Sequence, residues 1–164
     1  MDFWGVWRLV TPRDAWRLLK LLLRFPLFAY PTLSATIQCI RLCNAYFGRK
    51  HHKNNVANAF RHALWNFLIA AECKKWTRKN SKAVLWAELI TNWHEDFSPN
   101  RDLARAMDLH NNEVGRNVFL GNGTVSKEEG ITQLKLKLPD AIKIKTSDGL
   151  KKHTDRLVYI VDLK

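Results

Sequence analysis

The fold is decided by the stretch Val56-Ala57-Asn58-Ala59-Phe60-Arg61-His62-Ala63-Leu64-Trp65-Asn66-Phe67-Leu68-Ile69-Ala70-Ala71. In an α-helix, residues i, i+3, i+4 and i+7 lie on one face. At that spacing Asn58, Arg61/His62 and Trp65/Asn66 form one polar stripe along an otherwise apolar helix. We expect this helix to span about residues 55–77 and to be mostly buried.

A second polar stripe lies on the helix predicted for residues 101–118. Asp108, Asn111 and Asn112 share one side of it, and Gly115 on that side is expected to permit close approach of another helix. Buried polar groups cost free energy unless they are paired. The two stripes therefore either satisfy each other or form a functional site, and we favour a site.

Three further helices are predicted. The first begins at Thr11, which suits the N-cap, with Pro12 at the first helical position and Asp14 completing a capping box. It runs to about Arg24 and is ended by Phe25-Pro26. A second helix follows Pro31, and a third spans about residues 82–96.

The period of the sequence changes in the tail. Residues 126–129 form a capping box that predicts one short helical turn. Leucine then alternates with lysine over residues 134–138, and isoleucine alternates with lysine over residues 142–145. Residues 157–161 read as a strand, whereas residues 134–138 could also remain helical. The lysines of these strands are either a solvated face or part of a binding surface.

These patterns predict a mainly α protein, a single helical bundle of about five helices with a small C-terminal β hairpin. One domain is expected over residues 1–164. It comprises a basic amphipathic helical region (1–53), a motif core (54–118) and a basic α/β tail (119–164).

The net charge of +12 is unevenly distributed. Residues 1–53 contribute nine Lys/Arg and two Asp, so +7. Residues 54–130 contribute ten basic and nine acidic residues, so +1, and residues 131–164 contribute eight and four, so +4. Such a positive field attracts a phosphate-bearing partner, either a nucleic acid or an anionic membrane surface. The hydrophobic content of 46% and the seven Trp exclude a disordered chain.

The helix over residues 11–24 has two interpretations. Its apolar residues Trp16, Leu19, Leu22 and Leu23 are expected on one side and its basic residues largely on the other. It either lies on an anionic bilayer, with Trp4, Trp7 and Trp16 near the headgroups, or packs into the core as an ordinary helix.

The location and the cysteines follow from simple counts. No cleavable signal peptide is evident, and no uncharged run reaches the roughly 18 residues of a membrane span. We expect a cytoplasmic or peripheral membrane protein. Cys39, Cys43 and Cys73 are too few for a disulfide scaffold and are expected to be buried free thiols, although Cys39 and Cys43, at i and i+4, could share a metal.

Two chemistries are open to the polar residues. If the intervening helix brings their helices antiparallel, His62 can be a general base oriented by the carboxylate of Asp108. Alternatively His62, His94 and Asp108, with Glu95 or Asp96 nearby, can bind a divalent metal such as zinc or calcium. The His-Glu-x-x-His zinc pattern is absent, since only His94-Glu95 is present.

Substrate-binding roles are predicted for the remaining polar residues. Asn111 and Asn112 either hold a carbonyl or phosphoryl oxygen or bridge two helices. Arg116 either contacts a phosphate or pairs with Glu113. The stripe residues Asn58 and Asn66 complete the set of candidates, and His110 is expected beside the site or on the surface.

The motifs resemble a family of small helical bacterial domains of unknown function. The resemblance is carried by Asn58-Ala59-Phe60-Arg61-His62-Ala63-Leu64-Trp65-Asn66, by His94-Glu95, and by Met107-Asp108-Leu109-His110-Asn111-Asn112-Glu113-Val114-Gly115-Arg116. Members of that family are often found at the ends of large secreted or polymorphic antibacterial toxins. The resemblance implies an immunity protein as a possible partner. It also implies that the residues responsible for the function are His62, His94, Glu95, Asp108, Asn111, Asn112 and Arg116.

A looser analogy concerns the dyad alone. Secreted phospholipases A2 also place a catalytic His on one helix and its Asp partner on an antiparallel neighbour. Here Ala63 follows His62 and the cysteine framework is missing, so the shared logic is the His–Asp pair and not a calcium site.

Three functions are compatible with the sequence. The leading hypothesis is a hydrolase acting on a phosphate- or ester-bearing substrate, most simply a membrane phospholipid. The first alternative is a nuclease or a basic nucleic-acid-binding protein, which the net charge also supports. The second alternative is a non-enzymatic interaction protein in which the two polar stripes only pair with each other.

Overall fold

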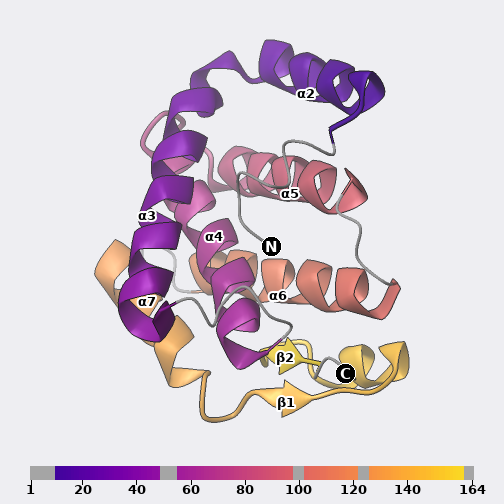
Figure 1. Cartoon of the computed structure of the whole chain (residues 1–164). Helices are drawn as coiled ribbons and strands as arrows, with labels where there is room; N and C mark the ends of the chain where they lie inside the picture. The colour runs from indigo at the N-terminus through magenta and orange to yellow at the C-terminus, as the bar shows by residue number, and fades with distance from the viewer. Residues whose placement is uncertain (1–9, 49–54, 98–101, 122–125, 161–164) are drawn as a thin grey trace.

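A computed structural model describes residues 10–48, 55–97, 102–121 and 126–160. Within these ranges the chain forms six α-helices: α2 (Pro12–Arg24), α3 (Ala29–Phe47), α4 (Val56–Lys74), α5 (Asn80–Phe97), α6 (Asp102–Leu120) and α7 (Lys127–Leu136). They are joined by the short 3-10 helices η2 (Pro26–Phe28) and η4 (Ser147–Lys152) and by two-residue strands β1 (Ile142–Lys143) and β2 (Val158–Tyr159) (Figure 1). The predicted mainly α bundle with small C-terminal strands is confirmed.

Helix α4 is the central element of the bundle. It contacts α3, α5, α6, α7 and β2, and its most extensive contact is with α6. Fourteen of its nineteen residues are buried, including the polar residues Asn58, His62 and Asn66. A helix that is apolar on most sides is stable only when neighbours surround it, which explains why the stretch quoted first organises the fold.

Helices α3, α4, α5 and α6 alternate in direction. Trp65 of α4 donates from Nε1 to Thr36 Oγ1 of α3 at 2.9 Å, and Thr91 of α5 donates from Oγ1 to Asn66 Oδ1 of α4 at 3.3 Å. On α6, Asp108 lies beside His62 and Gly115 beside Ala63, so that α4 and α6 run in the same direction. The expected antiparallel arrangement of these two helices is wrong, because two reversals of direction, one on each side of α5, restore the original direction.

A glycine brings the backbones of α4 and α6 together. A Cβ atom added to Gly115 would lie 2.0 Å from the carbonyl oxygen of Ala63. No side chain fits at that distance, so the predicted role of Gly115 in close helix approach is confirmed.

The surroundings of α2 differ from the prediction. The capping box at Thr11 is present, and Trp93 Nε1 of α5 donates to the Asp14 carbonyl at 2.9 Å. However, Leu22 packs against the core together with Leu18 and Leu21, whereas Trp16, Leu19 and Leu23 are exposed. The single apolar side expected for Trp16, Leu19, Leu22 and Leu23 is therefore split, because α2 is apolar over more of its circumference than one neighbour covers.

The tail departs from the predicted hairpin. Helix α7 continues to Leu136, so Leu134 and Leu136 are helical, and Leu134 is buried in the core. Strands β1 and β2 pair in parallel, with Ile142 opposite Val158, and the connection between them contains η4. A two-residue turn cannot join parallel strands, which is why the alternation pattern correctly located β1 and β2 but misjudged their pairing.

Two further expectations can be settled within the described residues. Cys39, Cys43 and Cys73 are buried free thiols, as predicted. No described helix is both long enough and apolar enough to cross a bilayer. Trp4 and Trp7, expected near the headgroups, lie outside the described residues.

Candidate functional site

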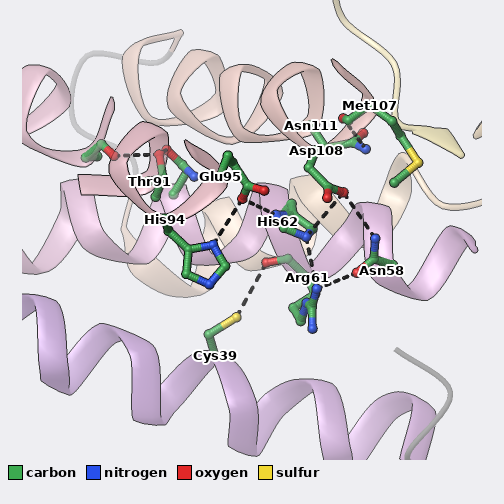
Figure 2. A network of polar contacts seen from close by, with 12 residues as sticks. Cys39, Asn58, Arg61, His62, Thr91, His94, Glu95, Met107, Asp108 and Asn111 are labelled. Carbon is green, nitrogen blue, oxygen red and sulfur yellow. Dashed lines mark hydrogen bonds and ion pairs between the residues drawn. The ribbon is translucent and has the colours of Figure 1, made fainter. Parts of the chain in front are cut away.

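Three ionisable side chains from three helices meet in the interior. His62 of α4 lies between Glu95 of α5 and Asp108 of α6, and all three are buried (Figure 2). Nε2 of His62 is 3.3 Å from Asp108 Oδ1, and Nδ1 is 3.5 Å from Glu95 Oε1. The residues singled out from the two stripes and from the His94-Glu95 pair are thus brought together, and we refer to His62, Glu95 and Asp108 as the triad.

Arg61 and Asn58 cover one side of the triad. Nη2 of Arg61 donates to Asn58 Oδ1 at 2.5 Å and contacts His62 Nε2 at 2.9 Å, and Asn58 Nδ2 donates to Asp108 Oδ1 at 3.2 Å. A guanidinium can only donate, so Nε2 of His62 is the acceptor and its proton lies on Nδ1, which faces Glu95. The contact geometry therefore assigns the neutral tautomer of this histidine.

His94 and Trp65 border the triad on the side of α3. His94 Nδ1 is 3.3 Å from Glu95 Oε1, and the edge of its ring meets the Trp65 ring with centroids 5.1 Å apart. With 19% of its side chain exposed, against 1% for Glu95, His94 links the buried carboxylate to the surface. Arg61, also partly exposed, does the same on the other side of His62.

The buried cluster is not fully satisfied by its own members. In and beside the triad, the described atoms that are buried without a hydrogen bond of acceptable geometry are His62 Nδ1, Asn66 Nδ2, Glu95 Oε2 and both amide atoms of Asn112. The three distances of 3.3–3.5 Å between imidazole nitrogens and carboxylates also exceed the roughly 2.7–2.9 Å of strong charge-assisted bonds. Because native interiors rarely leave such groups unpaired, the cluster has the character of a site that binds something.

Burial sets the protonation states of the triad. Desolvation, followed by the charge of Arg61, lowers the pKa of His62 from 6.5 to about 3. Desolvation and the neighbouring Glu95 raise the pKa of Asp108 well above its ordinary value. Burial also acts to raise the pKa of Glu95, but the hydrogen bond from His94 and the nearby positive charges lower it overall. The triad thus combines a neutral imidazole, an ionised Glu95 and an Asp108 that tends to keep its proton.

This protonation pattern makes folding sensitive to acid. Between pH 6.5 and about 5, His62 is expected to cost the folded state about 2 kcal/mol. In that window the unfolded chain binds a proton at His62 and the folded chain does not, so stability falls as the pH falls. Urea unfolding of the wild type and of His62→Gln across this window measures the effect. An equally steep pH dependence in His62→Gln would contradict the assignment.

Other predicted residues lie outside the triad. Asn66 Oδ1 of α4 accepts hydrogen bonds from Arg116 Nη1 of α6 at 3.0 Å and from Thr91 Oγ1 of α5 at 3.3 Å. Asn66 and Arg116 thus form a second polar contact between α4 and α6. Asn111 binds the backbone of Val158 through both ends of its amide, at 2.8 and 3.0 Å, and so fastens β2 to α6. His110 contacts the carbonyl oxygen of Arg156 at 2.9 Å, away from the triad.

The candidate metal ligands group differently from the prediction. Ligand atoms of His62, Glu95 and Asp108 lie within 4.8 Å of one another, and no other such group occurs in the described part of the chain. Glu95 takes the place expected for His94, and Asp96 instead pairs with Arg17 and Arg105 at 2.6 and 2.7 Å. A cation on Nε2 of His62 would require Arg61 to move, because its guanidinium already contacts that nitrogen.

Sequence reasoning missed the role of Arg61. It follows Asn58 by three residues, so helical spacing places the two side chains on one face, whereas its contact with the adjacent His62 depends on how the long Arg61 side chain folds back. Its contacts with their side chains make it the residue that holds Nε2 of His62.

Comparisons with known proteins give one result. A family model described as a domain of unknown function (DUF6973) matches residues 19–142. This range contains the triad and the three motifs at residues 58–66, 94–95 and 107–116. No curated protein and no solved structure matches the chain.

Proposed function

The chain belongs to the DUF6973 family, a domain of unknown function, and we propose that it is a hydrolase that cleaves an ester or phosphoester bond of a membrane phospholipid. One observation carries the proposal: a buried, neutral histidine has an acidic side chain from a different helix near each ring nitrogen, Glu95 at Nδ1 and Asp108 at Nε2. Imidazole and carboxylate in contact are the parts of a general-base centre. The unpartnered buried atoms of Asn112 and Glu95 add groups that a substrate or a water could satisfy.

The tautomer suggests a division of roles. Nδ1–H of His62 faces Glu95, so we assign Glu95 the orienting role that sequence reasoning gave to Asp108. Nε2 is then the basic atom, and the carboxyl of Asp108 lies beside it, where one of its oxygens can accept a hydrogen bond from the imidazolium formed when Nε2 takes up a proton. A water gives that proton, its oxygen attacks the ester carbon or the phosphorus, and the leaving alkoxide recovers the proton as an alcohol.

Arg61 connects substrate binding to this chemistry. In the free protein its charge lowers the pKa of His62 and its guanidinium covers Nε2. Arginine binds phosphate oxygens in bidentate fashion. A substrate phosphate that draws Arg61 away from His62 would uncover Nε2 and remove the second-largest cause of the lowered pKa of His62, the largest being burial.

The remaining polar residues would hold substrate oxygens. Asn112 is the best placed, because its buried amide faces His62 and raises the pKa of that residue. Asn58 and the Asn66–Arg116 pair are further candidates on the same helices. We leave Asn111 out of this group because its amide is used by β2.

A metal-assisted version of the same hydrolysis rests on the grouping of ligand atoms in the triad. Carboxylate oxygens and a neutral imidazole are suitable ligands for zinc, and the oxygens alone for calcium. A bound divalent ion would supply Lewis-acid activation of water or of the scissile group. The raised pKa of Asp108 fits either occupant, because a proton or a cation would offset the repulsion between the two carboxylates.

The test is lipid turnover by the purified full chain. The protein is incubated with phosphatidylcholine/phosphatidylglycerol vesicles, with and without a chelator, and products are identified by mass spectrometry. Lysolipid, diacylglycerol or free headgroup is expected, and His62→Ala should reduce the rate by at least about 100-fold. Loss of activity with chelator would favour the metal-assisted version.

His110→Ala is the matched control, because His110 lies on α6 outside the triad and should keep near wild-type activity. Intact lipids with every variant, or full activity in a folded His62→Ala protein, would overturn the proposal. Degradation of RNA or DNA in a parallel incubation would favour the nuclease alternative, which the net charge of +12 also supports.

The motif resemblance adds a biological context to the proposal. If the domain acts as a toxin, its target would be the membrane of a competing cell, and a dedicated immunity protein would be its partner. Growth arrest on expression of the wild type, but not of His62→Ala, would support that context. Normal growth with the wild type would contradict it.

A further inference from the structure

Residues 15–71 carry only one sign of fixed charge. Between Asp14 and Glu72 there is no Asp or Glu, whereas Arg and Lys recur throughout. Within the described residues this stretch comprises most of α2, all of η2 and α3, and nearly all of α4. Since α4 is buried, the surface formed by this stretch consists of α2, η2 and α3, which we call the N-terminal face.

The N-terminal face also exposes large apolar side chains at regular intervals along the chain. Leu23 on α2 and Tyr30 on α3 are each 70% exposed, and Trp16 is 56% exposed. The other members are Leu19, Leu27, Leu33 and Ile37. They recur every three or four residues from α2 through η2 into α3, which form the edge of the bundle drawn in indigo to purple (Figure 1). An extended apolar surface of this kind marks an interaction site.

Basic side chains lie among these apolar residues. Lys20 Nζ is 5.5 Å from the centroid of the Trp16 ring, and the Arg24 guanidinium is 5.4 Å from that of Phe25. Arg41 is exposed one turn after Ile37. In the described part of the chain, Lys20, Arg24 and Arg41 form no ion pair with a carboxylate, so their charge is available to a partner.

A cavity lies next to this surface, between α2 and α5. Its volume is about 330 Å³, and its lining includes Arg17, Lys20 and Arg24 on one side and Asn92, Trp93 and Asp96 on the other. Three cations and one carboxylate leave the cavity positively charged. Arg17 is paired with Asp96 and the Trp93 indole donates to the Asp14 carbonyl, so a phosphate group would be held by Lys20, Arg24 and the amide of Asn92.

We propose that the N-terminal face docks onto an anionic phospholipid bilayer, with the apolar side chains entering the acyl boundary and the cavity between α2 and α5 receiving a lipid phosphate. Interfacial amphipathic helices bind membranes by burying apolar side chains and by the attraction of their basic side chains to anionic lipids. Aromatic side chains such as Trp16 and Tyr30 suit the headgroup level. The link to lipid cleavage rests on the proposed function, whereas docking itself depends on residues outside the triad.

The test is co-sedimentation of the full chain with vesicles of phosphatidylcholine alone and of phosphatidylcholine with phosphatidylglycerol, at ~0.1 M salt. We expect binding that requires the anionic lipid and weakens as salt is raised. The double variant Trp16→Ser/Leu23→Ser should reduce the partition coefficient by at least about tenfold, because both side chains are exposed and their loss leaves the core intact. Lys20→Glu/Arg24→Glu should abolish the preference for anionic lipid.

Leu136→Ser is the matched control, because Leu136 on α7 is also 70% exposed but lies outside the N-terminal face, and it should bind as the wild type does. Equal binding to both vesicle types, unchanged binding of the double variants, or no binding would overturn the proposal. Sedimentation equilibrium without lipid tests whether the N-terminal face instead joins two copies of the chain. A dimer that Trp16→Ser/Leu23→Ser disrupts would also overturn the docking proposal.

The two proposals fail separately. His62→Ala should bind vesicles as the wild type does, since His62 is buried and distant in sequence from the N-terminal face. Anionic vesicle binding without lipid products would overturn the hydrolase and leave docking intact. Lipid products together with unchanged binding of both double variants would do the reverse.

Discussion

Asp108→Asn is expected to make the protein more stable and to inactivate it. At neutral pH we expect an increase of about 1–2 kcal/mol in the free energy of unfolding and a loss of at least about 100-fold in hydrolytic rate. Burial and the charge of Glu95 raise the pKa of Asp108, so ionising this carboxyl destabilises the folded state. Asn has the shape of the protonated acid and removes that cost.

The sign of the pH dependence makes this prediction specific. A group whose pKa is raised by folding contributes stability below its unfolded pKa and loses that contribution as the pH rises. The stability difference between Asp108→Asn and the wild type should therefore grow from acidic to alkaline pH. Urea unfolding at several pH values measures it, and a variant less stable than the wild type at neutral pH would contradict the assignment.

Asp96→Asn provides a control of opposite sign. Asp96 also accepts from arginine side chains, but it is partly exposed, and its pKa is lowered by hydrogen bonds from Arg17 and Arg105 that outweigh its partial burial. Removing its charge should leave stability unchanged or slightly reduced. A gain in stability from both substitutions would point to the net charge of the protein as the cause.

Gly115→Ala is expected to destabilise the protein by about 3 kcal/mol or more. The added Cβ would lie 2.0 Å from the Ala63 carbonyl oxygen and within 3 Å of two other backbone atoms of that residue. Backbone atoms cannot rotate away, so α6 must shift relative to α4. That shift would also separate Asp108 from His62, so activity should fall together with stability.

Helix propensity makes the outcome of Gly115→Ala informative. In an exposed helix interior, replacing Gly by Ala stabilises by about 1 kcal/mol, the opposite of the effect expected here. Glu113→Ala, at an exposed position of the same helix, is the control and should change stability little. Thermal or urea unfolding of both variants is sufficient, and a stabilised Gly115→Ala protein would refute the close contact.

Local patterns predicted the helices well. The capping box at Thr11 and the break at Phe25-Pro26 gave the bounds of α2, and the spacing of Asn58, His62 and Asn66 identified the inner face of α4. Gly115 was also interpretable, because a glycine on a polar inner face has a steric reason to be there. These features depend on neighbours within one or two helical turns, which the sequence contains.

Features that depend on distant partners were not predictable. Asn111 and Asn112 are adjacent and chemically identical, yet one holds β2 and the other faces His62, a distinction set by the docking of a strand 47 residues away. Which ring nitrogen of His62 faces Glu95 follows from the contact of Arg61 with the other nitrogen, and the exposure of Leu23 follows from which side of α2 packs against the core. Tertiary packing decides each of these cases.

The backbone contact between Gly115 and Ala63 has a consequence for the timescale of events at the triad. Two helices already in contact through their main chains cannot approach further, and the large shared interface opposes their separation. The groups between the triad and solvent are instead the side chains of Arg61 and His94, both partly exposed. Side chains of that kind rotate within picoseconds to nanoseconds, whereas helices rearrange in microseconds to milliseconds. We therefore expect entry to the triad to depend on fast rotamer changes of these two side chains, while α4 and α6 keep their relative position.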